Sequence, residues 1–356
     1  MELYREIVNL QFPSHFASSL LRAFAMKSLF GLLILMILWP VGARAASVDG
    51  EVRGAWVSAW NGGYLTPEQA DSTIAAAKAA GLNTLFIQAR KVADAYYDSS
   101  LEPRAPNLAP GFDPLGYMVE KAHAQGIRVH AWVNVCRVWI GKDMPTDPNH
   151  LVNLHPDWLN KDSSGGTRSG DGMFVDPGVP AAREHVAKIV QEIAKKYDID
   201  GLHLDYIRYP GKDWGYSAEA LRRYQSETGA RARPSPGDPK WLQWRRDQVT
   251  DLLKEIRKAV YEVRPGLQIS AATIAWAGCS WNFCSVAPYK LTCQDWKEWL
   301  SKGLLDANVP MNYQCESTAR GMSRFRSWLS GFRRWSGGKP TYVGINVHHN
   351  TPRGIL

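Results

Sequence analysis

The sequence predicts an α/β protein in which parallel strands alternate with helices, and a (β/α)8 barrel of the TIM type matches its size and rhythm. From Glu51 onward, seven segments with strand character are separated by segments with helical periodicity. An open doubly wound sheet is the alternative, but its GxGxxG turn is absent after the first strand, which reads GAWVSAWNGG. The chain ends at Leu356, just past the seventh strand, so we expect a barrel that lacks strand 8.

The helices carry clear start and stop signals. Helix 66–81 begins with Thr66 as N-cap and Pro67 in its first turn, and Gly81 ends it. Asp113 is expected to cap the following helix in the same way. The predicted strands cover residues 51–60, 82–90, 127–135, 199–207, 267–276, 304–313 and 340–347, and the other predicted helices cover 113–126, 180–197, 241–265, 295–302 and 321–335, with a long loop at 136–178.

Residues 1–45 are predicted to lie outside the single barrel domain, which we place at 46–356. Met26 starts a basic segment that leads into the apolar run SLFGLLILMILWP, and an Ala-x-Ala site ends at Ala45. This order is typical of a secretory signal peptide, with Met26 as the true start and cleavage after Ala45. The run is short for a membrane span, and a retained N-terminal anchor is the alternative. We expect a periplasmic or secreted protein with no stable membrane span after cleavage.

Composition narrows the classes of partner. The formal net charge is +8, but no basic tract dominates, so nucleic acid is not an expected partner. Five cysteines suit an oxidising compartment without forming a disulfide scaffold. Cys279, Cys284 and Cys293 crowd one short insert, CSWNFCSVAPYKLTC, where we expect one local disulfide. A zinc site there is the weaker alternative, because paired CxxC spacing and nearby histidines are absent.

The stretch DGLHLDYIRYP, residues 200–210, shows how the strands are expected to face. Leu202 and Leu204 share an apolar face that should meet helices, so His203 and Asp205 should point into the barrel. The same alternation places polar and aromatic side chains at the carboxyl ends of the other strands, where barrel active sites lie. The expected set is Trp60, Gln88, Arg90, Trp132, Asn134, His203, Arg208, Trp276, Asn312, Tyr313 and Asn346.

This set of side chains predicts recognition of sugars. Trp and Tyr rings pack on the apolar faces of pyranose rings, and Asn, Gln and Arg hydrogen-bond hydroxyl groups. Asp205 is the inward carboxylate at a strand end, and Arg208 is expected to keep it ionised. An ionised carboxylate beside an anomeric carbon acts as nucleophile or base. The alternative is a purely structural salt bridge between the two residues.

A glycosidase needs a second carboxylate as general acid. We expect this acid to be Glu316, just after the sixth strand, and Asp94, Asp213 and Asp295 are its rivals. With the pair unassigned, the sequence does not predict a retaining or an inverting outcome.

Two histidines, His130 and His203, should lie one layer deeper than Asp205 and orient it. A metal-dependent hydrolase that uses these three residues is the weakest hypothesis, because the histidines stand on separate strands without a ligand cluster. We expect no metal and no organic cofactor.

A series of motifs supports a family resemblance. In chain order they are RGAWVS, LNTLFIQAR, DAYYDS, FDPLGYMVEKAHAQGIRVHAWVN, HPDWL, VDPG, YDIDGLHLDYIRYP, WRRDQV and LLDANVPMNY. Together they resemble the glycosyl hydrolase-like family 10, bacterial cell-envelope proteins with a (β/α)8 barrel, over residues 51–347. The resemblance implies glycoside hydrolysis, and some members act on peptidoglycan glycan strands stripped of their stem peptides. It makes Asp205 the main catalytic candidate and places Gln88, Arg90, Asn134, Asn312 and Tyr313 in a substrate cleft.

We therefore expect a glycoside hydrolase that acts on a cell-envelope polysaccharide, with peptidoglycan glycan strands as the expected polymer. The alternative is a non-catalytic glycan-binding barrel that keeps the aromatic and amide side chains but lacks a working acid. The cysteine-rich insert departs from the family pattern and is expected to sit over the cleft. The sequence does not indicate a protein partner.

Overall fold

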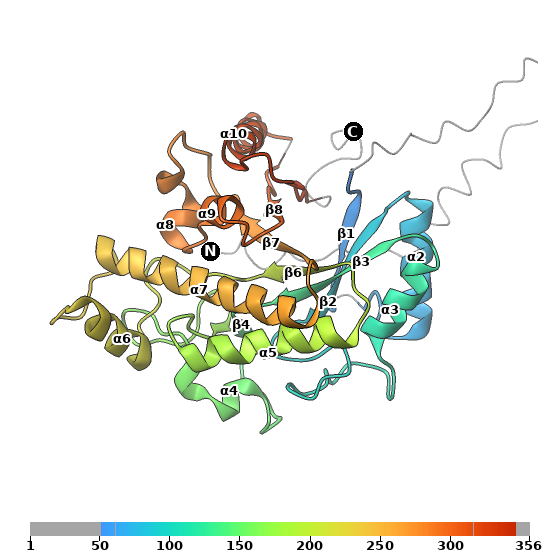
Figure 1. The fold of residues 1–356 in the computed structure, drawn as a ribbon, viewed down its shortest axis with the longest axis horizontal. Helices are drawn as coiled ribbons and strands as arrows, with labels where there is room; N and C mark the ends of the chain where they lie inside the picture. Colours follow the sequence, from blue (N-terminus) through green and yellow to red (C-terminus); the bar gives the residue numbers. More distant parts are fainter. Residues whose placement is uncertain (1–50, 61, 316, 347–356) are drawn as a thin grey trace, which may run out of the picture.

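The computed structural model describes residues 51–60, 62–315 and 317–346. The predicted signal segment and Glu316 lie outside these residues. The described chain forms an α/β fold around one curled parallel sheet (Figure 1). Its six strands, in spatial order, are β1 (Gly54–Val57), β2 (Thr84–Arg90), β3 (Arg128–Asn134), β6 (Gly201–Asp205), β7 (Gln268–Ile274) and β8 (Ala307–Met311). Every neighbouring pair in this sheet is parallel, as the alternation of strands and helices predicts.

The helices follow the strands in the predicted order. The longer ones are α2 (Pro67–Ala79), α3 (Pro114–His123), α5 (Pro180–Lys196), α6 (Ala218–Thr228), α7 (Pro239–Val263) and α10 (Ala319–Trp335), and the shorter ones are α4 (Leu151–Leu154), α8 (Ala287–Leu291), α9 (Trp296–Ser301) and the 3-10 turns η2 (Pro156–Trp158) and η3 (Phe283–Ser285). The predicted caps are confirmed: Thr66 accepts from the backbone N–H of Gln69, and Asp113 accepts from that of Gly116. No helix in the described ranges is long and apolar enough to cross a membrane.

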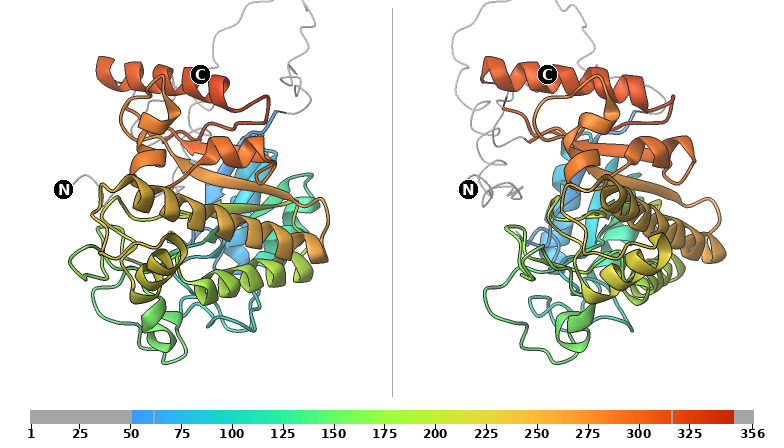
Figure 2. Two further views of the ribbon diagram at one scale, coloured as in Figure 1. Left: turned by 60° about the vertical axis from the view of Figure 1, so that its left-hand side comes forward. Right: turned by 90° about the vertical axis from the view of Figure 1, so that its left-hand side faces the viewer.

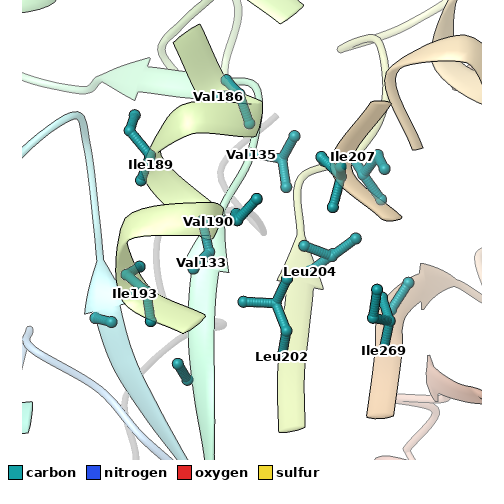
Figure 3. Close-up of a cluster of buried hydrophobic side chains, with 14 of the residues drawn as sticks. Val133, Val135, Val186, Ile189, Val190, Ile193, Leu202, Leu204, Ile207 and Ile269 are labelled. Atoms are coloured by element: carbon teal, nitrogen blue, oxygen red, sulfur yellow. The ribbon is translucent and has the colours of Figure 1, made fainter. Parts of the chain in front are cut away.

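The helices cover the sheet in three groups. Helices α5 and α7 lie side by side, α2 and α3 pack together toward the β1 end of the sheet, and α8, α9 and α10 lie toward the β8 edge (Figures 1 and 2). The alternating apolar residues of the strands face these helices, as Leu202 and Leu204 on β6 show. Both are fully buried near Ile189 and Val190 of α5 (Figure 3). Burial of one such side chain contributes about 1.5–3 kcal/mol to folding.

The long loop after β3 contains a small hairpin that the sequence did not indicate. Strand β4 (Arg137–Trp139) pairs antiparallel with β5 (Met173–Phe174), and the chain between them carries α4 and η2. Connections of this length are uncommon in compact domains and are often functional. Because β4 follows β3 directly, the hairpin stands at the carboxyl end of the parallel sheet.

The expectation of a barrel that lacks only its eighth strand is not confirmed. The parallel sheet has six strands, and β8 is the sixth of them because β4 and β5 form a separate sheet. In the described part of the seventh predicted strand, residues 340–346, the pairing consists of single parallel bridges from Thr341 to Asn308 and from Gly344 to Met311. Within the described residues, the sheet is therefore a half-barrel with a short parallel extension at its β8 edge.

Side chains across the interior bring the two edges of this half-barrel together. The Trp56 ring on β1 lies 6.5 Å from the ring of Tyr313, which follows β8, in an edge-on arrangement. A Cβ placed on Gly344 would lie 2.5 Å from the Trp56 indole, so this position has room only for glycine unless the indole moves. The close approach shows that the β1 edge curls toward the extension at the β8 edge.

The expected disulfide within the cysteine-rich insert is absent. Cys279, Cys284 and Cys293 are all free thiols. Cys293 is buried in the hydrophobic core, whereas Cys284 is exposed. Burial raises the pKa of the Cys293 thiol, which favours the unreactive form.

Candidate active site

Rings fill the interior of the half-barrel below the carboxyl ends of the strands. Phe86 on β2 lies 4.6 Å from His203 on β6 and 5.2 Å from His130 on β3, measured between ring centroids. Trp56 on β1 lies 5.7 Å from Phe86. The predicted inward direction of these strand residues is therefore confirmed, and they form a floor under the site.

His203 is a fully buried member of this floor. Its Nε2 accepts a hydrogen bond from Trp56 Nε1 at 2.9 Å, which assigns the proton to Nδ1, and Nδ1 lies 3.0 Å from the hydroxyl of Ser270. Burial and the neighbouring His130 lower the pKa of His203 to about 3. The imidazole is thus neutral at physiological pH, and its two nitrogens are occupied by protein groups rather than offered to a sugar.

His130 occupies the space left by Gly201, because a Cβ there would lie 2.5 Å from the imidazole. Neither of its ring nitrogens has a hydrogen-bond partner among the described residues. Burial lowers the pKa of His130 to about 4, so this ring is neutral as well. The described residues contain no group of three or more His, Cys, Asp or Glu side chains that could hold a metal ion.

Asp205 stands above this floor at the end of β6. One carboxylate oxygen accepts the backbone N–H of Tyr206 at 2.7 Å, and the other accepts Trp132 Nε1 at 3.2 Å. Burial raises the pKa of Asp205 above its usual value, and the guanidinium groups of Arg137 and Arg208 oppose this rise. Arg208 thus favours the ionised carboxyl, as the sequence predicts, but desolvation outweighs both arginines in the direction of the pKa shift.

Tyr206 holds an unusual backbone conformation next to Asp205. Its φ is 52°, in the left-handed region that bulky residues rarely occupy. Its ring lies under the guanidinium groups of Arg137, at 3.8 Å, and Arg208, at 4.7 Å. Arg137 also donates to the Tyr206 hydroxyl at 2.6 Å. Strained residues of this kind cluster at functional sites, and here the turn gathers two cations around the carboxyl.

A second carboxylate approaches from the β4–β5 hairpin. Asp171 lies in the loop that leads into β5, and its Oδ2 is 3.1 Å from a terminal nitrogen of Arg208. The Arg208 guanidinium also lies 5.5 Å over the ring of Trp276, at the end of β7. Arg208 therefore links Asp205, Asp171 and an aromatic face in one cluster.

Trp60 forms another aromatic face of the site. The ammonium group of Lys91 lies 3.6 Å above its ring, and the guanidinium of Arg137 lies 5.7 Å away. Burial lowers the pKa of Lys91 to about 8, and neighbouring Asp94 opposes that change. Burial raises the pKa of Asp94 to about 6. Asp94 thus remains a rival carboxyl at the border of the site.

Three predicted sugar contacts on β2 and β3 have structural partners. Arg90 is fully buried and forms a two-point ion pair with Glu102, at 2.6 and 2.7 Å. Its remaining nitrogen donates to the backbone carbonyls of Asn134 and Val135. Gln88 accepts from the backbone N–H of Ala59 at 3.0 Å, and Asn134 donates to the Lys91 carbonyl. All three side chains are buried, and their bonds hold the loops that carry Trp60 and Lys91, so their role in sugar binding stays a prediction.

The remaining predicted residues lie around the β8 end of the site. Asn312 is fully buried and donates to the carbonyl of Phe325 on α10, so it also serves the scaffold. Tyr313 is half-buried with its ring against Trp56, and Asn346 is nearly buried. Trp132 is buried behind Asp205, to which it donates.

The other rival carboxyls are less well placed than Asp171. Asp213 is exposed in the loop after β6. Asp295 caps α9 by accepting from the backbone N–H of Glu298 at 3.2 Å. Asp171, Arg137 and Lys91 were not predicted from the sequence. The unusual length of the loop after β3 could have pointed to Asp171 and Arg137, because long loops in compact domains are often functional.

A curled parallel sheet with a buried carboxyl, cations and tryptophans at the carboxyl ends of its strands is the architecture of a barrel glycosidase. The sequence profile of the family described as Glycosyl hydrolase-like 10 matches residues 51–346, and the chain belongs to this family. That family was the one indicated by the strand motifs.

Two curated relatives are similar over most of the domain. The chain is 28% identical over 318 residues to glycosyl hydrolase YngK of Bacillus subtilis, covering 82% of this chain and 59% of the relative. It is 26% identical over 258 residues to glycosyl hydrolase DigH of Escherichia coli, covering 65% and 55% of the two chains. The chain thus spans less than two thirds of the length of either relative.

Solved structures show the same fold at low identity. The glycoside hydrolase domain of PgaB (BpsB) from Bordetella bronchiseptica matches with a TM-score of 0.61 and 18% identity, covering 83% of this chain and 84% of that one. A Paenibacillus cycloisomaltooligosaccharide glucanotransferase matches with a TM-score of 0.53 and 10% identity, covering 83% and 38%. At these identities the likeness concerns the fold alone.

Proposed function

We propose that this chain is a glycoside hydrolase that cleaves a cell-envelope polysaccharide, with peptidoglycan glycan strands as its polymer. The observation that carries the proposal is the carboxyl group of Asp205, held at a strand end between two arginines and a tryptophan. Membership of a glycosyl hydrolase-like family supports the reaction class.

Asp205 is assigned as nucleophile or general base. Both of its oxygens accept N–H donors, an arrangement that suits the ionised form and aims it in one direction. Its raised pKa makes the ionised form a stronger base than an ordinary aspartate. Asp171 is the described carboxylate best placed to act as the general acid, because it shares Arg208 with Asp205. Glu316 stays a prediction beside it.

The arginines favour a glycan that carries negative charge. Nε and Nη1 of Arg208 and Nε of Arg137 are buried, and none of these N–H groups has an acceptor among the described residues. Unpaired buried donors are costly, so a ligand oxygen at this place would stabilise them. Peptide-free peptidoglycan strands expose the lactyl carboxylate of muramic acid, which is an acceptor of this kind.

The predicted signal peptide supports action in the periplasm or outside the cell. Its substrate is then a polysaccharide of the cell envelope. A glycan-binding protein without activity is the second candidate, and one observation favours it: Asp171 is held in an ion pair with Arg208, which restrains it as a proton donor.

The test is cleavage of purified peptide-free peptidoglycan strands by the chain without residues 1–45, with Asp205→Asn beside it. We expect shortened fragments from the wild type and a loss of at least about a thousandfold in kcat for the variant. Strands whose lactyl carboxyls have been reduced to alcohols form the matched control, and they should be cut more slowly. Equal cleavage by both proteins would remove Asp205 from the mechanism, and binding without cleavage by either would establish the glycan-binding protein.

A further inference from the structure

The cysteine-rich insert, residues 279–293, is anchored to the helices beside β8. The Phe283 ring of η3 is buried, with centroids 5.0 Å from Trp296 on α9 and 5.1 Å from Trp335 on α10. Tyr289 of α8 packs edge-on against the same ring at 5.7 Å. These contacts fix the shape of the insert without a disulfide, so a side chain that it presents to solvent is held in a defined place.

Trp281 is such a side chain. It is 82% exposed, more than any other large apolar residue in the described part of the chain. The guanidinium of Arg334 lies 3.7 Å over its ring, which orients the indole. A tryptophan held in this manner and left open to solvent provides a flat apolar surface.

Trp281 borders a surface hollow of about 400 Å³. Its lining combines the aromatic rings of Trp281, Tyr289 and Trp335 with the polar side chains of Asn282, Lys297 and Glu298. Ring faces next to short hydrogen-bonding groups match a sugar, which has an apolar face and a polar edge. The carboxyl groups of Asp295 and Glu298 and the ammonium group of Lys297 also line the hollow, which therefore fits neutral hydroxyl and amide substituents better than an anionic ligand.

The hollow lies close to the candidate active site along the chain. Trp276 stands over Arg208 at the end of β7, and Trp281 follows it five residues later. Five residues span at most about 18 Å, which bounds the distance between the two tryptophan Cα atoms. The two aromatic surfaces therefore lie on neighbouring parts of the molecule.

We propose that the hollow at Trp281 is a second glycan-contacting site, which holds the polymer outside the site of Asp205. Its ligand class is a neutral stretch of a polysaccharide, with one pyranose ring stacked on the free face of the indole. The choice of polymer rests on the proposed function, whereas binding at the hollow does not require that the chain cleave anything.

The experiment measures retention of Asp205→Asn on immobilised peptide-free peptidoglycan strands and on chitin. Adding Trp281→Ala should weaken retention about tenfold, and adding Lys297→Ala should weaken it by a smaller factor. The loss of retention caused by Trp281→Ala should be the same on carboxyl-reduced strands, because the hollow is not expected to bind the lactyl carboxylate. Leu154→Ala, at an exposed apolar residue on α4, is the matched control and should change nothing.

Retention that is unchanged by Trp281→Ala overturns the proposal, as does an equal loss in Leu154→Ala or no retention of any variant. Binding of stem peptides in place of glycan, if it depended on Trp281, would also overturn it. Because every protein in the assay carries Asp205→Asn, an inactive wild type would count against the proposed hydrolase and leave this inference standing.

Discussion

The carboxyl group of Asp205 experiences opposing influences. Burial raises its pKa, and Arg137 and Arg208 limit that rise. A carboxyl in this balance holds its proton more tightly than an exposed aspartate, whose pKa is about 3.9. The cations around it therefore set the pH at which the group becomes an active base.

The acid limb of the pH profile of kcat/KM should report this balance. If Asp205 acts as a base or nucleophile, activity rises as pH rises through its pKa, because only the ionised form reacts. Arg137→Gln removes one opposing cation, so the pKa of Asp205 rises further and the acid limb moves to higher pH. The position of the limb is independent of the size of the activity loss. A limb that stays in place or moves to lower pH would contradict the assignment.

Arg90 and Glu102 form the most completely buried ion pair described in the chain. Burial raises the pKa of Glu102, but Arg90 and His185 together outweigh it and the pKa falls to about 2. A carboxyl whose pKa is depressed on folding stabilises the protein above its unfolded pKa of about 4.3 and loses that contribution as pH falls toward about 2.

Glu102→Gln should lower the free energy of unfolding by about 3–5 kcal/mol at pH 7, because it leaves a buried guanidinium without its partner. The difference from the wild type should shrink as pH falls from about 4.3 toward 2. Urea unfolding at several pH values measures it. Glu120→Gln breaks an exposed pair with Lys121 and should change stability by less than about 0.5 kcal/mol. If Glu102→Gln changed the free energy of unfolding only slightly at pH 7, the Arg90–Glu102 ion pair would not be a major contributor to stability.

These residues also show what the sequence can and cannot predict about the site. The inward direction of Asp205 and His203 follows from period-two alternation in β6, and the structure confirms it. The same alternation predicts that Arg90 points inward. It could not predict the ion pair of its guanidinium with Glu102, which lies in a loop twelve residues later. Side chains in loops have no periodicity, so the partners of strand residues could not be predicted from pattern.

At the scale of elements, the helix termini were the most predictable features. Thr66 and Asp113 cap α2 and α3 as expected, because a cap depends on a few neighbouring residues. The β4–β5 hairpin was missed because its strands have three and two residues, too few for a periodic pattern. The hairpin is nevertheless the element that brings Arg137 and Asp171 to Asp205.

Asp171→Asn tests the contribution of this hairpin. If Asp171 donates the proton to the leaving sugar, kcat/KM should fall by about a hundredfold or more on glycan strands and much less on a sugar with an activated aryl leaving group, which needs no proton. A purely structural role would lower activity on both substrates alike. Asp157→Asn, at an exposed residue of the same long loop, is the control and should keep the wild-type activity on both substrates. An equal loss on both substrates in Asp171→Asn would move the role of acid to another carboxyl, with Glu316 and Asp94 next in order.

At the scale of the whole molecule, the alternation of strands and helices was enough to predict the parallel sheet, but not how far the sheet curls. Curl depends on contacts between strands that are remote in sequence, such as those of Trp56 with Tyr313 and Gly344. Trp56 also donates to His203, so the contact between the sheet edges is connected to the floor of the candidate active site.

Gly344→Ala should therefore disturb both the fold and the site. The added Cβ would lie 2.5 Å from the Trp56 indole and 3.2 Å from the Pro310 carbonyl, so we expect a loss of about 1–3 kcal/mol in the free energy of unfolding. Gly237→Ala is the control, since its Cβ would meet nothing within 4 Å. Trp56→Phe frees space at the contact, so the double variant should be more stable than the sum of the single losses predicts. If the losses in the free energy of unfolding of the two single variants add up to that of the double variant, residues 56 and 344 do not interact. The curl of the sheet would then have to come from the twist of the strands themselves.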